Sequence, residues 1–580
     1  MTMRRNGGAA RLLWALPIMG LWLPNRVLAE EFFVATTGSD DAAGTEASPF
    51  ATVERAEAQA SPGDTVYIRG GAYRFSGTRR TVGVAFTKSG QPDRPIRYFA
   101  YPGEVPVFDL SEVAPQARVT GLDIRSNWIH LRGLEVTRVR QLIVGDSWGV
   151  RARGDHNVLE GLNVHHCEAP GVFITSGSDN RVLNCDSHHN YDPLEDGENA
   201  DGFGCHSTGG NNVLRGCRAY ENSDDGFDFI NSPGTCLVEH SWAFRNGYVP
   251  ETNRPSGNGA GFKSGGFGYP PRIPATGVPR HVVRFSVAFD NRAQGFYANH
   301  HPGGLDFIHN TAFDNPANFD MRVTGGVSTH LLRNNLAVPA GVPITNFTGG
   351  SDEFNSWSLS VDPTKDDFRS MDKSQATAPR EPDFSLPKVP LARLKDESNL
   401  VDRGEDQDLP FAGSAPDLGA FETGLPEDAR EGDTNQDDDT PNVDERPPSP
   451  EAPEPAQQEP SEQETPGPDE AMPPATPEPD PDPTSTQASS GTEGASLDPK
   501  QTTDPKRGDL PAWAGSGPEE LDQPTAGTRS INAAQATSPH ASGPAASDCG
   551  CRMARPSTHH PMAPLLACGA YLLLHRRRPR

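Results

Sequence analysis

The most reactive combination of residues in this sequence is a cluster of carboxylates followed by an isolated lysine. Asp224, Asp225 and Asp228 occur in one short polar run, and Lys263 comes 35 positions after Asp228. Only 8 of the 51 basic residues are lysines, and no other lysine lies within 100 positions of Lys263. Arginine stays protonated at physiological pH, whereas a lysine becomes a usable base when its pKa is lowered. Lys263 therefore indicates amine chemistry, and the alternative is a chance surface lysine.

The elements that must position these residues follow from two repeated units. The first unit ends in an asparagine and recurs with a shortest spacing of 24 residues, at Asn190, Asn222, Asn246, Asn291 and Asn315. The second unit is Gly-Phe plus one variable residue, at 202–204, 226–228, 261–263 and 295–297. Short apolar runs separated by Gly, Asn and Asp turns at this period predict a β-solenoid, in which equivalent residues stack in columns. We interpret the asparagines as a structural ladder of stacked amides.

The predicted columns bring the carboxylates and the lysine together. One column contains Gly204, Asp228, Lys263 and Tyr297, and a neighbouring column contains Asp201 and Asp225, with Asp224 beside them. Carboxylates crowded at a rung spacing of about 4.8 Å repel one another unless a cation holds them. Ligation by oxygen alone selects a hard ion with flexible geometry, for which Ca²⁺ is the best candidate. The alternative for residues 223–226 is an ordinary polar turn.

At these residues the sequence resembles the calcium-dependent right-handed parallel β-helix lyases of polysaccharide lyase family 9, which include pectate lyases. The resemblance covers roughly residues 31–424 and is most specific in Asn-Ala-Asp-Gly-Phe at 199–203 and Gly-Phe-Lys-Ser-Gly-Gly at 261–266. It implies an all-β fold, a right-handed parallel β-helix. It also implies that calcium is bound by four aspartates and that Lys263 is the catalytic base; the aspartates are Asp201, Asp224, Asp225 and Asp228.

A site with these parts is suited to β-elimination on a uronate polymer. The C5 proton of a uronate lies next to a carboxylate and becomes acidic when a cation neutralises that carboxylate. We expect a neutral Lys263, its pKa lowered by the cation and by burial, to remove this proton. The O4-linked sugar then leaves without consumption of water, and the resemblance implies polygalacturonate as the substrate. Tyr297, one rung further along, is expected to contact sugar; the alternative is an exposed aromatic of a ladder.

Two other functional classes remain compatible with the sequence. A hydrolase of acidic glycans needs a pair of carboxyl groups that flank the scissile bond, and it leaves Lys263 without a role. A non-catalytic surface β-helix that binds polysaccharide fits the fold alone, but it gives no reason for a lysine beside carboxylates.

Three further segments are expected to frame the solenoid. A capping helix over residues 53–59 is expected to close the N-terminal end, before a first strand at 65–69, because an open end exposes core and strand edges. The proline-rich stretch 245–280 is too long for one coil, so we expect loops on either side of the Lys263 strand that shape a substrate cleft. Residues 350–411 lack the period and are expected to pack along the side.

The cysteines and histidines of the solenoid are interpreted as structural. The cysteines are Cys167, Cys185, Cys205, Cys217 and Cys236. Cys185 and Cys217 align in one column, where stacked buried thiols fit better than a redox site. One or two disulfides remain possible among the five cysteines, because the sequence cannot fix their pairing. Two histidine pairs, at 165–166 and 188–189, also align, but a zinc site needs a third ligand.

Charge divides the chain into a folded part and a linker. The formal net charge is −27 over 580 residues, and residues 425–524 hold 26 acidic and 5 basic side chains, a net of −21. The segment 425–547 is rich in Pro, Glu, Asp, Ser and Thr, which predicts a disordered acidic linker. The solenoid, 30–424, is only mildly acidic, which argues against a nucleic-acid partner. We expect a monomer that acts on an acidic polysaccharide.

Both ends of the sequence carry targeting signals. Arginines precede the apolar run 12–23, and Val27-Leu28-Ala29 offers a cleavage site, so residues 1–29 are predicted as a signal peptide. Residues 548–580 combine a Cys-Gly-Cys motif, a short apolar run at 562–574 and three arginines at 576–578, and they resemble the MYXO-CTERM sorting tails of myxobacterial surface proteins. The layout implies a secreted enzyme held at the cell surface by a tail that associates with the membrane and the sorting machinery.

Overall fold

The computed structural model describes residues 29–425, except for 116–117, 143–146, 269–272, 274–276, 324–328 and 339–341. The predicted sorting tail, all but the first residue of the predicted linker, and all but the last residue of the predicted signal peptide lie outside the described residues. Within the described part, no helix combines the length and the apolar character that a membrane crossing requires.

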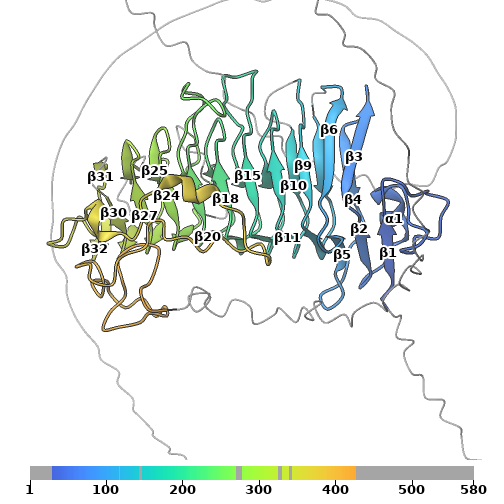
Figure 1. Cartoon of the computed structure of the whole chain (residues 1–580). Helices are drawn as coiled ribbons and strands as arrows, with labels where there is room; N and C mark the ends of the chain where they lie inside the picture. Colours follow the sequence, from blue (N-terminus) through green and yellow to red (C-terminus); the bar gives the residue numbers. More distant parts are fainter. Residues whose placement is uncertain are drawn as a thin grey trace, which may run out of the picture. The chain divides into compact units, whose positions relative to one another are not determined.

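The described strands form three parallel sheets that run the length of a β-helix (Figure 1). In order along sheet A lie β1 (Glu31–Val34), β2 (Thr65–Ile68), β5 (Ile96–Ala100), β8 (Ile129–Arg132), β11 (Val158–Glu160), β14 (Arg181–Leu183), β17 (Asn212–Arg215), β20 (Cys236–Glu239), β23 (Val282–Arg284), β26 (Asp306–Ile308), β29 (His330–Arg333) and β32 (Gly350–Glu353). Sheet B contains β4 (Val82–Phe86), β7 (Thr120–Ile124), β10 (Trp148–Ala152), β13 (Val172–Ile174), β16 (Phe203–Cys205), β19 (Phe227–Asp228), β22 (Phe262–Lys263), β25 (Gln294–Tyr297), β28 (Ala317–Asp320) and β31 (Val342–Thr345). Sheet C contains β3 (Gly71–Gly77), β6 (Pro106–Val113), β9 (Glu135–Thr137), β12 (Asn163–His165), β15 (Asp186–His188), β18 (Arg218–Tyr220), β21 (Trp242–Phe244), β24 (Val287–Phe289), β27 (Thr311–Phe313) and β30 (Leu336–Ala337).

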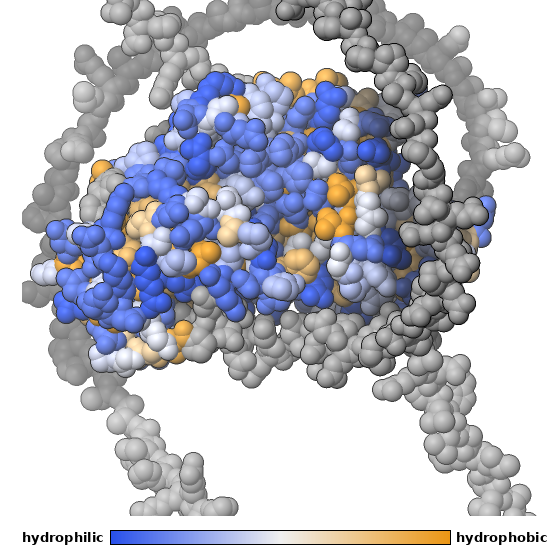
Figure 2. All heavy atoms as spheres, in the orientation of Figure 1, coloured by the Kyte–Doolittle hydropathy of each residue, from blue (hydrophilic) through white to orange (hydrophobic). Residues whose placement is uncertain are grey.

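Stacked phenylalanines hold the rungs of sheet B in register. The phenylalanines of the Gly-Phe units face the core, and each ring lies 4.7 to 5.1 Å from the next; they are Phe203, Phe227, Phe262, Phe296 and Phe319. Because side chains alternate along a strand, the residue after each phenylalanine faces away from the core. The surface seen in Figure 2 is mainly hydrophilic, with scattered apolar residues, as expected when the aromatic residues stack inside.

The predicted asparagine ladder is confirmed. Each side-chain amide nitrogen donates to the carboxamide oxygen of the next rung at 2.9 to 3.1 Å, and all five residues are buried. Two further ladders, which the sequence analysis missed, run through Asn157, Asn180 and Asn212, and through Asn310, Asn335 and Asn355. The ladders satisfy backbone N–H groups at the turns, where no sheet partner is available.

The capping helix is confirmed as α1 (Val53–Gln59), with the Thr52 hydroxyl accepting a hydrogen bond from the Arg55 N–H at its start. Val53 and Ala56 are buried against the end of the core. The strand predicted at 65–69 is present as β2, but the prediction that it is the first strand is wrong, because β1 precedes the helix and pairs with β2. Phe33 and Val34 of β1 are buried, and β1 covers the edge of β2 that would otherwise be unpaired.

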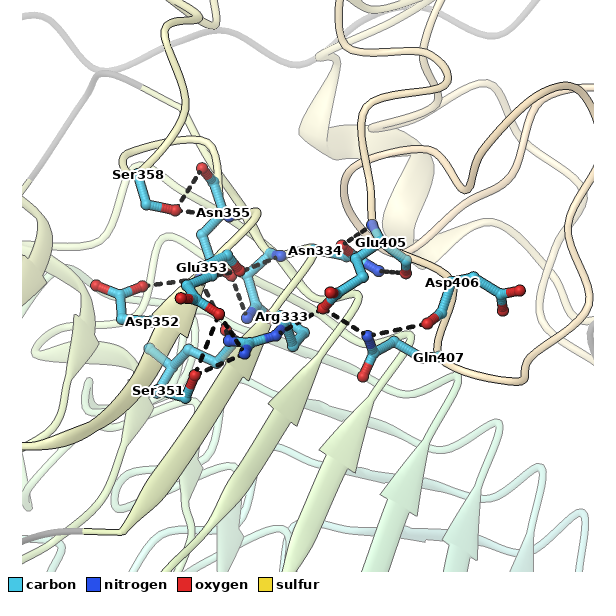
Figure 3. A network of polar contacts seen from close by, with 12 residues as sticks. Arg333, Asn334, Ser351, Asp352, Glu353, Asn355, Ser358, Glu405, Asp406 and Gln407 are labelled. Carbon is cyan, nitrogen blue, oxygen red and sulfur yellow. Dashed lines mark hydrogen bonds and ion pairs between the residues drawn. The ribbon is translucent and has the colours of Figure 1, made fainter.

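The segment after β32, here called the strap (residues 354–425), packs on the outside of sheet C, as predicted for 350–411 except that the first four residues form β32. It contains two short 3₁₀ helices, η1 (Lys365–Asp367) and η2 (Lys373–Thr377). Leu391, Leu394 and Leu400 join one apolar cluster with the outward rings of sheet C. Figure 3 shows its polar attachment, in which the Arg333 guanidinium bonds Glu405 at 3.0 Å and Glu353 at 2.8 Å.

The cysteines divide between one disulfide and buried thiols. Cys205 and Cys236 form the disulfide, whereas the thiols of Cys167, Cys185 and Cys217 are free and buried. The histidine pairs stack as predicted, His165 on His188 with ring centroids 5.1 Å apart and His166 on His189 at 5.2 Å. They do not belong to any described group of three converging metal-ligating side chains.

We predict that Asn222→Ala lowers the free energy of unfolding by about 3 kcal/mol, because it leaves the amide of Asn190 and the carbonyl of Ser187 without their buried partner. Urea unfolding followed by circular dichroism measures the change. The exposed Asn253→Ala is the matched control and is expected to be nearly neutral. Equal stability of the two variants would show that the ladder does not stabilise the fold.

Candidate active site

The predicted column of sheet B is confirmed. In parallel register, Gly204 pairs with Asp228, Asp228 with Lys263, and Lys263 with Tyr297. Each of these residues follows a core phenylalanine, so the register of the phenylalanine stack places them on the opposite face of the sheet. Gly204 is required at its rung, because a Cβ there would lie 2.2 Å from the ring of Phe173. The missing side chain thus leaves room for the ring of Phe173.

Three of the four predicted metal ligands converge. Asp201, Asp225 and Asp228 each offer a carboxylate oxygen, and these oxygens lie within 4.8 Å of one another. All three residues are buried. Two backbone groups orient them, since the Asp225 N–H donates to Asp201 Oδ1 at 3.1 Å and the Ala260 N–H donates to Asp225 Oδ1 at 2.6 Å. The turn that precedes β19 and the loop that precedes β22 therefore position the cluster.

Asp224 lies beside this cluster but outside it. Its two carboxylate oxygens accept hydrogen bonds from the backbone N–H groups of Asn199, at 2.7 Å, and Asn258, at 2.6 Å. Asp224 thus ties together two loops, one before β16 and one before β22. Metal ligation by Asp224 stays a prediction, because the backbone bonds use only part of the acceptor capacity of a carboxylate.

Lys263 forms an ion pair with the carboxylate cluster. Its Nζ lies 2.9 Å from Asp225 Oδ2 and 3.1 Å from Asp228 Oδ2, and the residue is only 9% exposed. Burial by itself lowers the pKa of Lys263, but the surrounding carboxylates outweigh burial and raise this pKa well above its ordinary value. The protein's own charges therefore act against the lowered pKa that we predicted from the sequence. A cation on the same oxygens acts in the opposite direction.

The carboxylates fit a hard divalent cation. Burial and then mutual repulsion raise the pKa of Asp201 and bring that of Asp224 to about 8, and burial also raises the pKa of Asp225. Asp225 Oδ2 is buried and accepts no well-aligned hydrogen bond from the described residues, so its contact with Lys263 is an ion pair alone. An oxygen-only donor set that includes such an oxygen suits Ca²⁺.

Three residues beside the cluster were missed by the sequence analysis. His206 Nε2 lies 4.0 Å from Asp228 Oδ2 and forms no hydrogen bond with any described residue. The Asn258 side chain donates to Glu198 Oε2 at 2.7 Å, which links the loop before β22 to the loop before β16. His206 lies two positions after the Gly-Phe unit of β16, so the repeat could have revealed it. Glu198 and Asn258 lie in loops outside the repeat.

The loops on either side of β22 are confirmed in the described part of 245–280. Before β22, the Ser256 hydroxyl donates to the Asp196 carbonyl at 2.6 Å, and Arg292 Nη2 donates to the Asn258 carbonyl at 2.8 Å. After β22, the Gly266 N–H donates to His301 Nδ1 at 3.2 Å. Tyr297 is partly buried on the next rung, and the Arg322 guanidinium lies 5.7 Å from its ring centroid.

Comparison with known proteins agrees with the fold. A family model described as "Pel9A-like, right handed beta helix region" matches residues 32–335. Pectate lyase L of Dickeya chrysanthemi is 36% identical over 401 residues, which cover 67% of this chain and 90% of that protein.

Two solved structures share the architecture. The crystal structure of pectate lyase Pel9A superposes with a TM-score of 0.59 at 34% identity and covers 68% of this chain and 96% of that one. A rhamnogalacturonan lyase superposes with a TM-score of 0.60 at 33% identity, with 63% and 97% covered. The chain therefore belongs to the Pel9A-like right-handed β-helix family, polysaccharide lyase family 9.

Proposed function

We propose that this polysaccharide lyase cleaves uronate polymers, polygalacturonate first among them, by calcium-assisted β-elimination with Lys263 as the general base. The observation that supports this function best is the position of Lys263, one rung from Asp225 and Asp228 and two rungs from Asp201. The oxygens of these three buried carboxylates lie within 4.8 Å of one another. We assign calcium binding to Asp201, Asp225 and Asp228, with Asp224 as a fourth ligand. The names of the relatives, pectate lyase and rhamnogalacturonan lyase, agree with a uronate substrate.

The ion and the lysine have separate roles in the proposed reaction. When bound, calcium neutralises the carboxylate of the substrate and so makes its C5 proton more acidic. Lys263 in its neutral form takes this proton on Nζ. The electron pair of the C5–H bond forms the C4–C5 double bond, and the C4–O4 bond breaks with its electrons leaving on O4, which then takes up a proton. The product carries an unsaturated uronate at its non-reducing end, and no water is consumed.

The geometry gives less support to hydrolysis. A hydrolase holds two carboxyl groups on either side of a glycosidic bond, typically about 5 to 9.5 Å apart. Here the carboxylate oxygens of the cluster converge on one point, and two of the carboxylates pair with Lys263. This arrangement suits a cation and a base better than a separated acid and base.

We further propose that the enzyme is exported and held at the cell surface. The support is in the sequence, in the N-terminal signal at 1–29 and the sorting tail at 548–580. An acidic linker of more than 100 residues between the solenoid and the tail would place the active site away from the cell envelope, where a polymeric substrate has access.

Lys263→Ala is expected to lower the lyase rate on polygalacturonate by about 1,000-fold, because the base is lost while the fold is kept. The ultraviolet absorbance of the unsaturated uronate measures this rate. Lys365→Ala, an exposed lysine on the strap, is the matched control. New reducing ends without the absorbance would identify a hydrolase, and no product from a panel of uronate polymers would favour a binding protein.

Asp225→Asn is expected to weaken calcium binding by about 10-fold or more, because it removes the charge of a fully buried ligand. Isothermal titration of the protein with Ca²⁺ measures the affinity without any substrate. Asp396→Asn, at an exposed residue of the strap, is the control and should bind calcium like the unaltered protein. A chelator should abolish the absorbance change, and activity that survives chelation would contradict the calcium mechanism.

Deletion of residues 1–29 is expected to retain the protein inside its native cells, whereas deletion of 548–580 is expected to release it into the medium. Cell fractionation with an antibody against the solenoid measures both. Release of the full-length protein into the medium would contradict surface attachment.

A further inference from the structure

The outward column of sheet B continues past Lys263 to an aspartate that holds a cation, Arg322. Beyond Lys263 the register passes through Tyr297 to Asp320 and then to Thr345. Arg322 follows Asp320 by two positions and binds it with two hydrogen bonds, from Nε to Oδ1 at 3.1 Å and from Nη2 to Oδ2 at 2.5 Å. Two rungs correspond to about 10 Å, so this guanidinium lies within reach of a polymer that occupies Lys263.

The Arg322 side chain is held in place by what surrounds it. Asp320 is 1% exposed, and it also accepts hydrogen bonds from the amides of Asn346, at 2.8 Å, and Gln294, at 3.5 Å. The guanidinium lies 5.7 Å from the ring centroid of Tyr297, which adds a cation–π contact on one face. A side chain that is already ordered loses little entropy when it binds a ligand.

One edge of this guanidinium remains available to a ligand. The bonds to Asp320 use Nε and Nη2, and no described residue accepts a hydrogen bond from Nη1. The Arg322 side chain is 40% exposed. The N–H donors on Nη1 are therefore available to a further carboxylate.

The two halves of the column therefore present opposite charge to a substrate. On one side of Lys263 lie carboxylates, which can bind a uronate only through a cation. On the other side lie an aromatic ring and a guanidinium, which can bind a uronate directly, the ring against the sugar and the guanidinium against its carboxylate. A polymer with carboxylates on more than one sugar can use both.

We propose that Tyr297 and Arg322 form a second carboxylate subsite, which binds a uronate of the same chain other than the one that is cleaved. The subsite rests on the proposed function for its substrate, an oligomer of uronates. It makes the enzyme favour substrates long enough to reach from the aspartate cluster to Arg322 with a carboxylate at both positions.

Binding to the inactive Lys263→Ala protein tests the subsite apart from catalysis. With Ca²⁺ present, oligogalacturonates of increasing length are titrated into Lys263→Ala and into Lys263→Ala/Arg322→Gln. Loss of Arg322 is expected to weaken the longer oligomers by about 10-fold and to leave unchanged the shortest oligomer that binds. A carboxyl-reduced, neutral oligomer of the same length should bind both proteins equally.

Two further variants distinguish a purely structural role of Arg322 from direct binding of the oligomer. Lys263→Ala/Asp320→Asn/Arg322→Gln removes the buried charge that Arg322 neutralises, and it should show the same length-dependent loss. Lys263→Ala/Arg369→Gln breaks an exposed Arg–Asp pair on the strap and should bind like Lys263→Ala.

The outcomes separate the subsite from the proposed reaction. Equal binding of long oligomers with and without Arg322, or an equal loss for acidic and neutral oligomers, overturns the subsite even if the enzyme cleaves polygalacturonate. Arg322-dependent binding supports the subsite even if the unaltered protein forms no unsaturated product, in which case the lyase function fails alone.

Discussion

The structure depends on the register of parallel rungs stacked about 4.8 Å apart. Core phenylalanines and buried asparagine ladders repeat on successive rungs, and both interactions are lost if one rung slips by a residue. A slip of one residue would also exchange the two faces of a strand, turning Lys263 into the core and Phe262 out of it. The geometry of the candidate site is therefore set by core residues that take no part in its chemistry.

The same register brings buried carboxylates together, an arrangement that would be unfavourable without partners of opposite charge. Three buried carboxylates within 4.8 Å repel one another, and Lys263 together with backbone N–H groups offsets part of that cost. Lys263 pairs with Asp225 and Asp228, two of the residues that the proposed cation would use. Cation binding and the charge of the lysine are thus coupled, since a cation that occupies these oxygens removes the ion pairs that keep the amine protonated.

The sequence predicted those site residues whose positions are set by the repeat alone. The Gly-Phe units placed Asp228, Lys263 and Tyr297 in one column because each residue depends only on strand register. The anchoring of Asp224 depends on two loops whose lengths differ from rung to rung, so no period reveals it. Arg322 was missed for a similar reason, because it lies two positions beyond its strand and reaches the column through its side chain.

Sheets B and C show how one repeat supports two different faces. The outward rings of Tyr220, Phe244, Phe289 and Phe313 stack along sheet C with centroids 4.8 to 4.9 Å apart. Left in water, this column would be a long apolar patch, and the strap removes it from solvent by packing leucines against it. Around Lys263 the outward column of sheet B carries mainly charged and polar residues instead, which gain little from such a cover. Placement of the strap on sheet C therefore follows from the hydrophobic effect.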